Sequence, residues 1–526
     1  MNKRNRVRAF ALAAVWSLGV LLSNSVASAD GVGVADKRAK AVSVPWTEPV
    51  PQADCQRSDW TESGLQGQTT PYERFSGDSE GGYNCNLELV GQYQGEGAKS
   101  QGGIAYSGDC AYYATNNNVL QQRRGVVVID ASDPQHPQAS GSLDEPAVLD
   151  PHESLRHNDR RKLLAAVENT AFNNPLPAAS AFALYDVSAD CAHPVLKSSI
   201  YIPGLLGHAG GFSPDGLTYY ATHVPELGMT VIDVSDPTQP KKLGYITDLA
   251  HDVAINGDGT RAYVSHLGHY PAQYPFLTGQ NGLTILDVSD YQLRRPNPQS
   301  KVISQLFWDD GGGAEVLVPI SYNGRPFLIV TDEAGSDPGG IAASCARGLA
   351  PYGFARIIDI SDERNPKIAS KLMLEVDDPA NCPIVASDPP DVRGGTPEYS
   401  GEHCNVDRPS NPTMAVCGYK NAGLRVFDIR DPYRPKEIAY YKPPAPRASF
   451  LPGSATWASG RDLTIDRIAG NARVRKVPAN GTHGRELQIW FVSDGGGFQI
   501  VRFSNAFMET KQGNALHKSV FESSAE

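Results

Sequence analysis

The stretch Gly-Val-Val-Val-Ile-Asp-Ala-Ser-Asp-Pro at residues 125–134 decides the fold, because versions of it return along the chain. The closest copy is Gly-Met-Thr-Val-Ile-Asp-Val-Ser-Asp-Pro at residues 228–237. Related segments lie at residues 282–290, 355–362 and 423–432, and a weaker one lies at 182–190. A unit that recurs every 40 to 50 residues or so indicates a solenoid, a propeller or an array, since one unit cannot bury its own apolar face.

Each repeat contains four short strand patterns, here called A to D. In the unit that begins at His208, residues 218–222 (strand B) are rich in β-branched and aromatic residues. The repeated core at 229–234 is strand C, and residues 242–246 (strand D) follow a turn that contains proline. Strand B recurs at residues 111–115, 162–167, 218–222, 261–265, 326–331, 413–417 and 487–493. Strand A begins near Gln101, His152, His208, His251, Ala314, His403 and Ser454.

The last unit stops after its strand C, at residues 498–503, and has no strand D. Residues 87–93 carry the missing pattern at the other end of the chain. An N-terminal strand that completes the last sheet closes a ring and leaves no open sheet edge. We therefore predict an all-β fold, a seven-bladed β-propeller in which an N-terminal strand closes the last blade. A parallel β-solenoid is the alternative, but it does not need that displaced strand.

The N-terminal residues predict export. Four basic residues precede an apolar run from Ala9 to about Leu22, and Ala-Ser-Ala ends at Ala29. This order is typical of a cleaved signal peptide. A membrane anchor is the alternative, but the run is short of the roughly 20 residues that span a bilayer. We expect a signal peptide at 1–29, an N-terminal extension at 30–85, the propeller at 86–505 and a tail at 506–526, with the mature protein secreted or periplasmic.

Charge excludes some partners. Loss of the four basic residues of the leader moves the formal net charge from -11 to -15. A chain of this charge repels nucleic acid and anionic lipid. We expect a monomer with no nucleic-acid partner and no stable membrane span, which binds a small organic substrate or a surface ligand.

The repeated core resembles the LVIVD repeat, on the Val/Leu-Val-Ile-Asp run and the Ser-Asp-Pro that follows it. The resemblance covers about residues 87–503 and implies a secreted or surface propeller, but it implies little about activity. Two units depart from the pattern. The second lacks the proline after Asp190, and the last has Gln-Ile-Val-Arg-Phe-Ser in place of the core.

The aspartate of each repeated core precedes a turn, where its carboxylate can accept backbone N–H bonds. We therefore assign these aspartates a structural role and not a catalytic one. They are Asp130, Asp186, Asp233, Asp287, Asp359 and Asp428.

The eight cysteines of an exported chain predict four disulfides, which spacing alone could pair in 105 ways. The blade assignment selects among them, because partners must share one face of the ring or lie on adjoining strands. The predicted pairs are Cys55–Cys85, Cys110–Cys191, Cys345–Cys382 and Cys404–Cys417.

Histidines gather at the starts of the strands A, which face the axis of a propeller. His152, His208, His251 and His403 hold this position in four different blades. Neutral imidazole together with carboxylate is a ligand set for Cu, Fe, Zn or Ni. We predict that these four histidines bind a transition metal ion, with Cu or Fe favoured and Zn as the alternative.

Carboxylates and further histidines occupy neighbouring positions. Glu315 starts the strand A of the fifth blade, and we predict that it is a fifth ligand or a base. Other polar residues follow the strands B and are predicted to support the site or transfer protons; they are Glu168, His223, His266 and Asp332. Glu153, Asp252 and Glu402 adjoin three of the histidines and are expected to accept from their second ring nitrogen.

The architecture is similar to that of selenium-binding methanethiol oxidases and carotenoid cleavage oxygenases, which are propellers with an axial histidine-bound metal. The similarity implies a metal-dependent oxidase or oxygenase, although fold alone does not fix function. Long connections at 266–280, 333–352 and 377–402 are expected at the same face, where Tyr270, Tyr274 and Phe276 could wall an organic substrate. The alternative is a non-catalytic scaffold that binds protein or glycan, with structural histidines.

Overall fold

The computed structural model describes residues 45–99, 102–116, 122–169, 179–223, 228–268, 280–337, 339–390, 397–446, 451–454, 464–478 and 485–522. Contacts divide the chain into Met1–Val42 and Ser43–Glu526, and the description below concerns the second unit alone. The predicted signal peptide at residues 1–29 lies outside the described residues, as does the segment that holds Tyr270, Tyr274 and Phe276.

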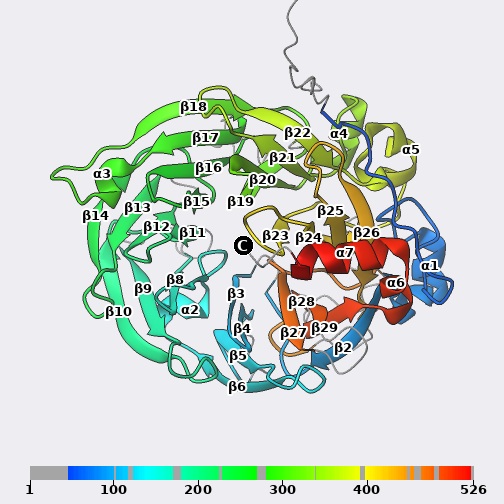
Figure 1. The fold of residues 1–526 in the computed structure, drawn as a ribbon, viewed down its shortest axis with the longest axis horizontal. Helices are drawn as coiled ribbons and strands as arrows, with labels where there is room; N and C mark the ends of the chain where they lie inside the picture. The colour runs from blue at the N-terminus through cyan, green and yellow to red at the C-terminus, as the bar shows by residue number, and fades with distance from the viewer. Residues whose placement is uncertain are drawn as a thin grey trace, which may run out of the picture. The chain divides into compact units, whose positions relative to one another are not determined.

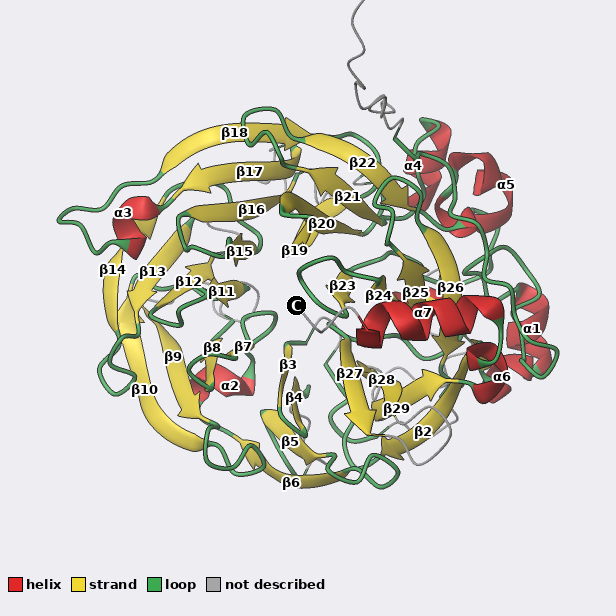
Figure 2. Cartoon of the chain, viewed as in Figure 1, coloured by secondary structure: helices red, strands yellow, loops and turns green. Residues whose placement is uncertain are grey.

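Seven antiparallel sheets form a ring around a central channel (Figures 1 and 2). The predicted seven-bladed propeller is therefore confirmed. Blade 1 consists of β3 (Ile104–Ser107), β4 (Cys110–Ala114), β5 (Val126–Asp130) and β6 (Gln138–Leu143). Blade 2 consists of β7 (Arg156–Asn158), β8 (Leu163–Val167), β9 (Ala179–Asp186) and β10 (Val195–Pro203). Blade 3 consists of β11 (Gly210–Phe212), β12 (Thr218–Thr222), β13 (Met229–Asp233) and β14 (Lys241–Ile246). Blade 4 consists of β15 (Val253–Ile255), β16 (Arg261–Leu267), β17 (Asn281–Asp287) and β18 (Lys301–Phe307). Blade 5 consists of β19 (Gly313–Tyr322), β20 (Arg325–Glu333), β21 (Ala355–Asp359) and β22 (Lys367–Leu372).

The two remaining blades recruit N-terminal strands. Blade 6 consists of β23 (His403–Val406), β24 (Met414–Tyr419), β25 (Gly423–Asp428) and β26 (Lys436–Lys442), with β1 (Tyr83–Cys85) added at its outer edge. Blade 7 consists of β27 (Arg473–Pro478), β28 (Arg485–Ser493), β29 (Gly497–Phe503) and β2 (Leu87–Tyr93). The pairing of β2 with β29 is the predicted closure of the ring.

The repeated core is apolar along its whole length because each copy forms a strand that is packed between two adjacent blades. In β5, Val126 and Val128 pack toward blade 2, whereas Val127 and Ile129 pack toward blade 7. Successive side chains of a strand point to opposite faces, so a blade covered on both faces needs apolar residues at every position. Seven buried clusters of this kind occur in the described residues, one at each junction between adjacent blades.

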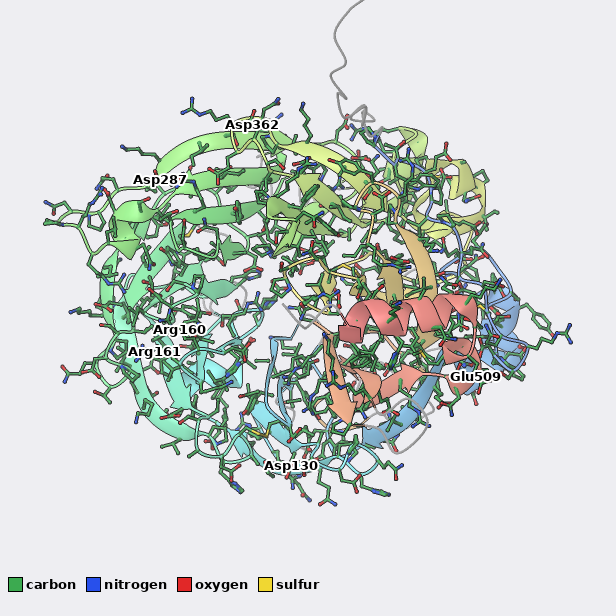
Figure 3. All side chains as sticks on the ribbon, in the orientation of Figure 1. Asp130, Arg160, Arg161, Asp287, Asp362 and Glu509 are labelled. Atoms are coloured by element: carbon green, nitrogen blue, oxygen red, sulfur yellow. A yellow bond between two sulfur atoms is a disulfide. The ribbon has the colours of Figure 1, made fainter. Side chains whose placement is uncertain are left out.

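The repeated aspartates lie at the outer part of the ring, where Figure 3 labels Asp130 and Asp287. In every copy the carboxylate accepts the backbone N–H of the residue two positions later, at 2.9–3.1 Å. This bond fixes the turn after strand C. The structural role assigned to these residues is therefore confirmed.

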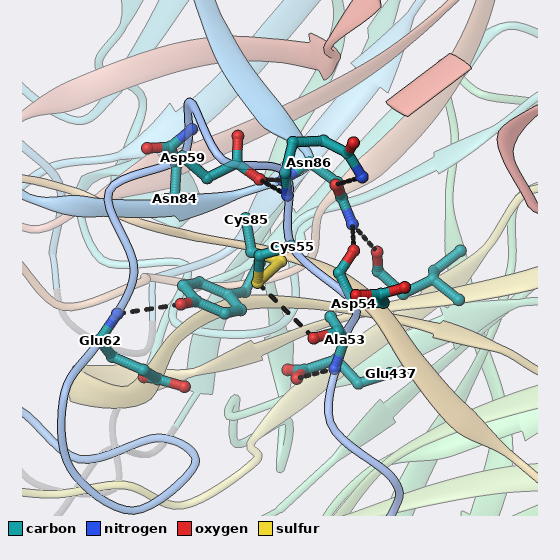
Figure 4. The surroundings of a disulfide bond; sticks show 12 residues. Ala53, Asp54, Cys55, Asp59, Glu62, Asn84, Cys85, Asn86 and Glu437 are labelled. Carbon is teal, nitrogen blue, oxygen red and sulfur yellow. Dashed lines mark hydrogen bonds between the residues drawn. A yellow bond between two sulfur atoms is a disulfide. The ribbon is translucent and has the colours of Figure 1, made fainter. Parts of the chain in front are cut away.

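All four predicted disulfides are confirmed, and no described cysteine is free. Cys55–Cys85 ties the N-terminal segment to β1 (Figure 4). In the same segment the backbone N–H of Ala53 donates to Glu437 of β26 at 3.3 Å. The N-terminal extension is thus fastened to the outer edge of blade 6.

One detail of the predicted blades was wrong. Strand A of blade 7 is β27, 19 residues after the predicted start at Ser454, because a long segment separates β26 from it.

The predicted tail contains helices α6 (Asn505–Met508) and α7 (Lys511–Glu522). Leu516 and Val520 of α7 pack into the core between blades 6 and 7. The other helices are short: α1 (Pro71–Ser76), α2 (Pro146–Leu149), α3 (Ser289–Gln292), α4 (Ile341–Ala346) and α5 (Cys382–Val385). Among the described helices, none has the length and apolar character needed to cross a membrane.

Candidate metal centre

The four predicted histidines stand at one end of the innermost strands of blades 2, 3, 4 and 6. His208 and His251 lie two residues before β11 and β15, and His403 is the first residue of β23. His152 lies four residues before β7 and has a φ of 44°, in the left-handed region that non-glycine residues seldom adopt. Positions equivalent in sequence thus converge at the centre of the ring.

A carboxylate lies at the middle of this group. One oxygen of Glu153, Oε2, is 3.7 Å from Nε2 of His208 and 3.6 Å from Nε2 of His251. The same oxygen is 3.8 Å from Nδ1 of His152. The other oxygen, Oε1, is 3.7 Å from Nε2 of His403. Imidazole nitrogens from four blades therefore surround one carboxylate.

The histidine rings also touch one another. Nε2 of His208 lies 2.8 Å from Nε2 of His251, and the two ring centroids are 4.7 Å apart. The His152 ring is tilted against His208 at a centroid distance of 4.3 Å. Backbone bonds hold the arrangement, since the N–H of Glu153 donates to the carbonyl of His208 at 3.2 Å. The ligand segments of blades 2 and 3 are thus fixed to each other.

Two further carboxyls complete the group. Ligand atoms of Glu153, His251 and Glu315 all lie within 4.8 Å of one another. The same holds for Glu315, Glu402 and His403. Glu315 is placed in β19 at an irregularity of its pairing with β20. The predicted ligand or base Glu315 therefore lies among the four histidines.

Burial controls the protonation of the group. The side chains of the four histidines are 3–9% exposed, and that of Glu153 is 2% exposed. Burial lowers the pKa of His208 to about 3 and that of His403 to about 4, and it lowers the pKa values of His152 and His251 well below the usual range. The imidazoles are therefore neutral at neutral pH, which is the form that binds metal.

The carboxyls respond in the opposite direction. Burial raises the pKa of Glu153 to about 7 and that of Glu315 well above its usual value. Apart from a hydrogen bond between the two carboxyls, no donor among the described residues binds their oxygens. Buried carboxylates of this kind need a cation or a shared proton.

An ion pair lies beside the cluster, toward the inside of the channel. The guanidinium of Arg156 donates to Asp252 at 3.1 Å and to the carbonyl of Gly210 at 2.9 Å. Asp252 was expected to accept from a histidine, but its carboxylate is engaged with Arg156. Both side chains also line a cavity of about 420 Å³ that is bounded by the innermost strands of the seven blades.

A buried lysine neutralises part of the negative charge. Nζ of Lys420 lies 3.0 Å from Glu402 and 2.7 Å from Glu398. Burial by itself lowers the pKa of Lys420, but the charges of Glu398 and Glu402 outweigh it, so that pKa is raised. The second oxygen of Glu402 is 3.9 Å from Nδ1 of His403, where the sequence predicts an acceptor.

The other four predicted residues are bonded within their own blades. Their partners are Ala181 N–H for Glu168, Leu206 N–H and Thr230 for His223, Thr284 for His266, and Arg356 and Trp308 for Asp332. None of them belongs to the groups of clustered ligand atoms found in the described residues. The structure thus brings together five of the nine predicted residues.

Sequence reasoning missed the central position of Glu153 and the charges of Arg156 and Lys420. It also missed two hydroxyls that hold ligand segments across blades. Thr222 donates to the carbonyl of His251 at 2.6 Å, and Thr331 donates to that of Glu402 at 2.6 Å. Both residues are near the ends of strands B, so their recurrence at that position was the available signal.

A cavity of about 650 Å³ opens between blades 4 and 5. Its walls include the aromatic rings of Phe307 and Trp308. Leu267, Gly313 and Ala334 also line it. Gly313 lies two residues from Glu315 in β19, so the cavity adjoins the strand that carries a clustered carboxyl.

Fold and site together define a seven-bladed β-propeller with a buried histidine–glutamate cluster at the centre of its ring. Comparison with family models identifies LVIVD repeats at residues 100–145, 224–248 and 273–291. The propeller therefore contains LVIVD repeats, as the repeated core indicates.

Two solved structures are similar to this chain at a low level. A protein from Lactobacillus plantarum is 12% identical with a TM-score of 0.41, over 62% of this chain and 79% of that one. Kuenenia stuttgartiensis hydrazine synthase is 12% identical with a TM-score of 0.43, over 79% of this chain and 96% of that one. No curated protein matches the sequence. Function must therefore be argued from the site.

Proposed function

We propose that this protein is an exported, metal-dependent oxidoreductase whose ion is bound by His152, His208, His251 and His403. The observation that carries the proposal is the convergence of their ring nitrogens, at 3.6–3.8 Å, on the single buried carboxylate of Glu153. Structural histidines would each find a partner inside their own blade, as His223 and His266 do.

The donor set selects the class of ion. Imidazole nitrogens with carboxylate oxygens suit Cu, Fe and Zn, and a redox reaction favours Cu or Fe. An ion at this position would replace the proton that Glu153 and Glu315 share and would bind their carboxyl oxygens. When bound, it would supply redox chemistry or activate oxygen.

The surrounding residues would prepare the site for a small organic substrate. Phe307 and Trp308 give the 650 Å³ cavity an aromatic wall against which such a molecule can pack. Glu315, whose pKa burial raises, would accept a proton from the substrate. The oxidant would be O₂. As an oxidase, the protein would pass two electrons and two protons from substrate to O₂ and form hydrogen peroxide; as an oxygenase, it would insert both atoms of O₂ into the substrate, which needs no further reductant.

Four residues stay outside the proposed chemistry. Glu168, His223, His266 and Asp332 are bonded in their own blades, so they would stabilise the blades that carry the site. The export in this proposal is supported by four disulfides, which persist in oxidising compartments.

Metal analysis of the purified protein tests the proposal. After reconstitution with Cu(II) or Fe(II), we expect at least one bound ion per chain and a loss of at least half of the bound metal in His208→Ala. His136→Ala, which changes an exposed histidine on a turn, is the matched control and should bind metal as the wild type does. Less than half an equivalent in the wild type, unchanged by His208→Ala, would contradict the proposal and favour a binding scaffold.

A further inference from the structure

We infer that the centre binds two metal ions, bridged by the carboxylate of Glu153. The inference deepens the proposed function and rests on it for the first ion, but it assigns His403 to a second ion. It concerns the number of ions, so it can fail while the proposed function stands.

The two oxygens of Glu153 face different ligand sets. Oε2 lies 3.6–3.8 Å from ring nitrogens of His152, His208 and His251. For His403 the nearest oxygen is instead Oε1, which lies 3.7 Å from its Nε2. A carboxylate placed between two sets of ligands, with one oxygen toward each, is the arrangement of a bridging ligand.

Glu315 provides a second link between the two sets. Its ligand atoms cluster with Glu153 and His251 on one side and with Glu402 and His403 on the other. Glu315 is fully buried, and the described residues offer its carboxyl oxygens no hydrogen-bond donor other than the carboxyl of Glu153. A carboxyl in this state is aimed at a ligand that the protein itself does not supply.

The cluster contains more carboxyls than one bound ion would need as ligands. Glu153, Glu315 and Glu402 lie in one buried cluster, and Lys420 forms an ion pair with Glu402 at 3.0 Å. Glu402 then uses its second oxygen at Nδ1 of His403, which would orient that ring and leave its Nε2 for an ion. Glu153 and Glu315 are left to share the charge of the bound cations.

The two halves differ in chemistry. The first ion would have three imidazoles and Oε2 of Glu153, a nitrogen-rich set suited to Cu or Zn. The second would have His403, Glu315 and Oε1 of Glu153, an oxygen-rich set suited to Fe or Zn. Carboxylate-bridged ions of this kind lie about 3.5–4 Å apart and act on one substrate together.

The test counts ions in the folded holoprotein. The full chain is reconstituted with Cu(II), and in a separate sample with Fe(II), and bound metal per chain is measured by native mass spectrometry. We expect two ions in the wild type and one in Glu315→Gln and in His403→Ala. His136→Ala, which changes an exposed turn histidine remote from the clustered groups, is the control and should keep two ions.

A second measurement makes the result independent of folding defects in a variant. In copper-loaded wild type, coupling between bridged ions should reduce the integrated EPR intensity below one spin per copper. Glu315→Gln should restore one spin per copper. One ion per wild-type chain, with full EPR intensity, would overturn the inference and leave the proposed function intact. No bound ion would overturn both.

Discussion

Nε2 of His208 and Nε2 of His251 lie 2.8 Å apart, although the two residues come from different blades. Neutral imidazoles at this distance form one hydrogen bond, and a bound ion would take its place. Because the ion binds only the folded ring, saturating metal should stabilise the protein, by about 4 kcal/mol at a concentration 1,000 times its Kd. Thermal unfolding with and without Cu(II) measures this effect.

The same thermal unfolding experiment is repeated with His208→Ala, which lacks one of the proposed metal ligands. We expect the metal-dependent rise in Tm to fall to a small fraction of the wild-type value. In His193→Ala, which changes an exposed turn histidine, the full rise should remain. An equal rise in all three proteins would show that metal binds elsewhere.

Lys420 is predicted to be essential for the stability of the metal-free protein. Its ammonium is buried between Glu398 and Glu402, and Glu398 also pairs with Arg467, so Lys420→Met chiefly removes the cation beside the buried carboxylate of Glu402. Removal of one partner of a buried pair costs about 3–5 kcal/mol. Chemical denaturation should show a loss of this size, and Glu402→Gln in the same chain should recover part of it. Additive losses in the double variant would contradict the coupling.

His223 should make stability depend on pH in acid. Burial lowers its pKa in the folded protein to about 4, whereas an unfolded histidine titrates near 6.5. Between these values the unfolded chain binds a proton that the folded chain does not, so stability falls as pH falls from about 6.5 to 4. One such group contributes about 1.4 kcal/mol per pH unit. His223→Gln should make the slope of unfolding free energy against pH shallower by that amount, whereas His193→Gln should leave it unchanged.

The packing of the closing strand β2 can be tested by a glycine-to-alanine substitution, which adds one methyl group. A Cβ at Gly91 of β2 would lie 2.2 Å from the carbonyl oxygen of Pro134 in blade 1, so Gly91→Ala should destabilise the protein by about 1–3 kcal/mol. Gly141 has the equivalent place in β6, where a Cβ would meet nothing within 4 Å. Gly141→Ala should therefore be neutral or slightly stabilising. Equal effects at the two glycines would argue against the packing of β2 on blade 1.

The repeats made the ring predictable. Strand B of blade 3 and the closing strand, residues 218–222 and 87–93, were predicted with the bounds that the structure has. The disulfides followed because face and neighbour are fixed once each cysteine is placed in a blade. Strand A of blade 7 was misplaced because that unit lacks the repeated core and follows a long segment.

The site was predictable only in part. Equivalent strand starts indicated which histidines converge, since all blades point the same position toward the axis. The central role of Glu153 depends on distances across four blades, which sequence spacing does not contain. The same holds for Arg156, which crosses blade 3 at Gly210 to reach Asp252 in blade 4.

A crystal structure of the reconstituted protein, with anomalous data at the absorption edge of the bound metal, tests the central claim most directly. We predict an anomalous peak within bonding distance of ring nitrogens of both His208 and His251. A fully loaded crystal with no peak between those blades, or with metal only at surface histidines, would contradict the account.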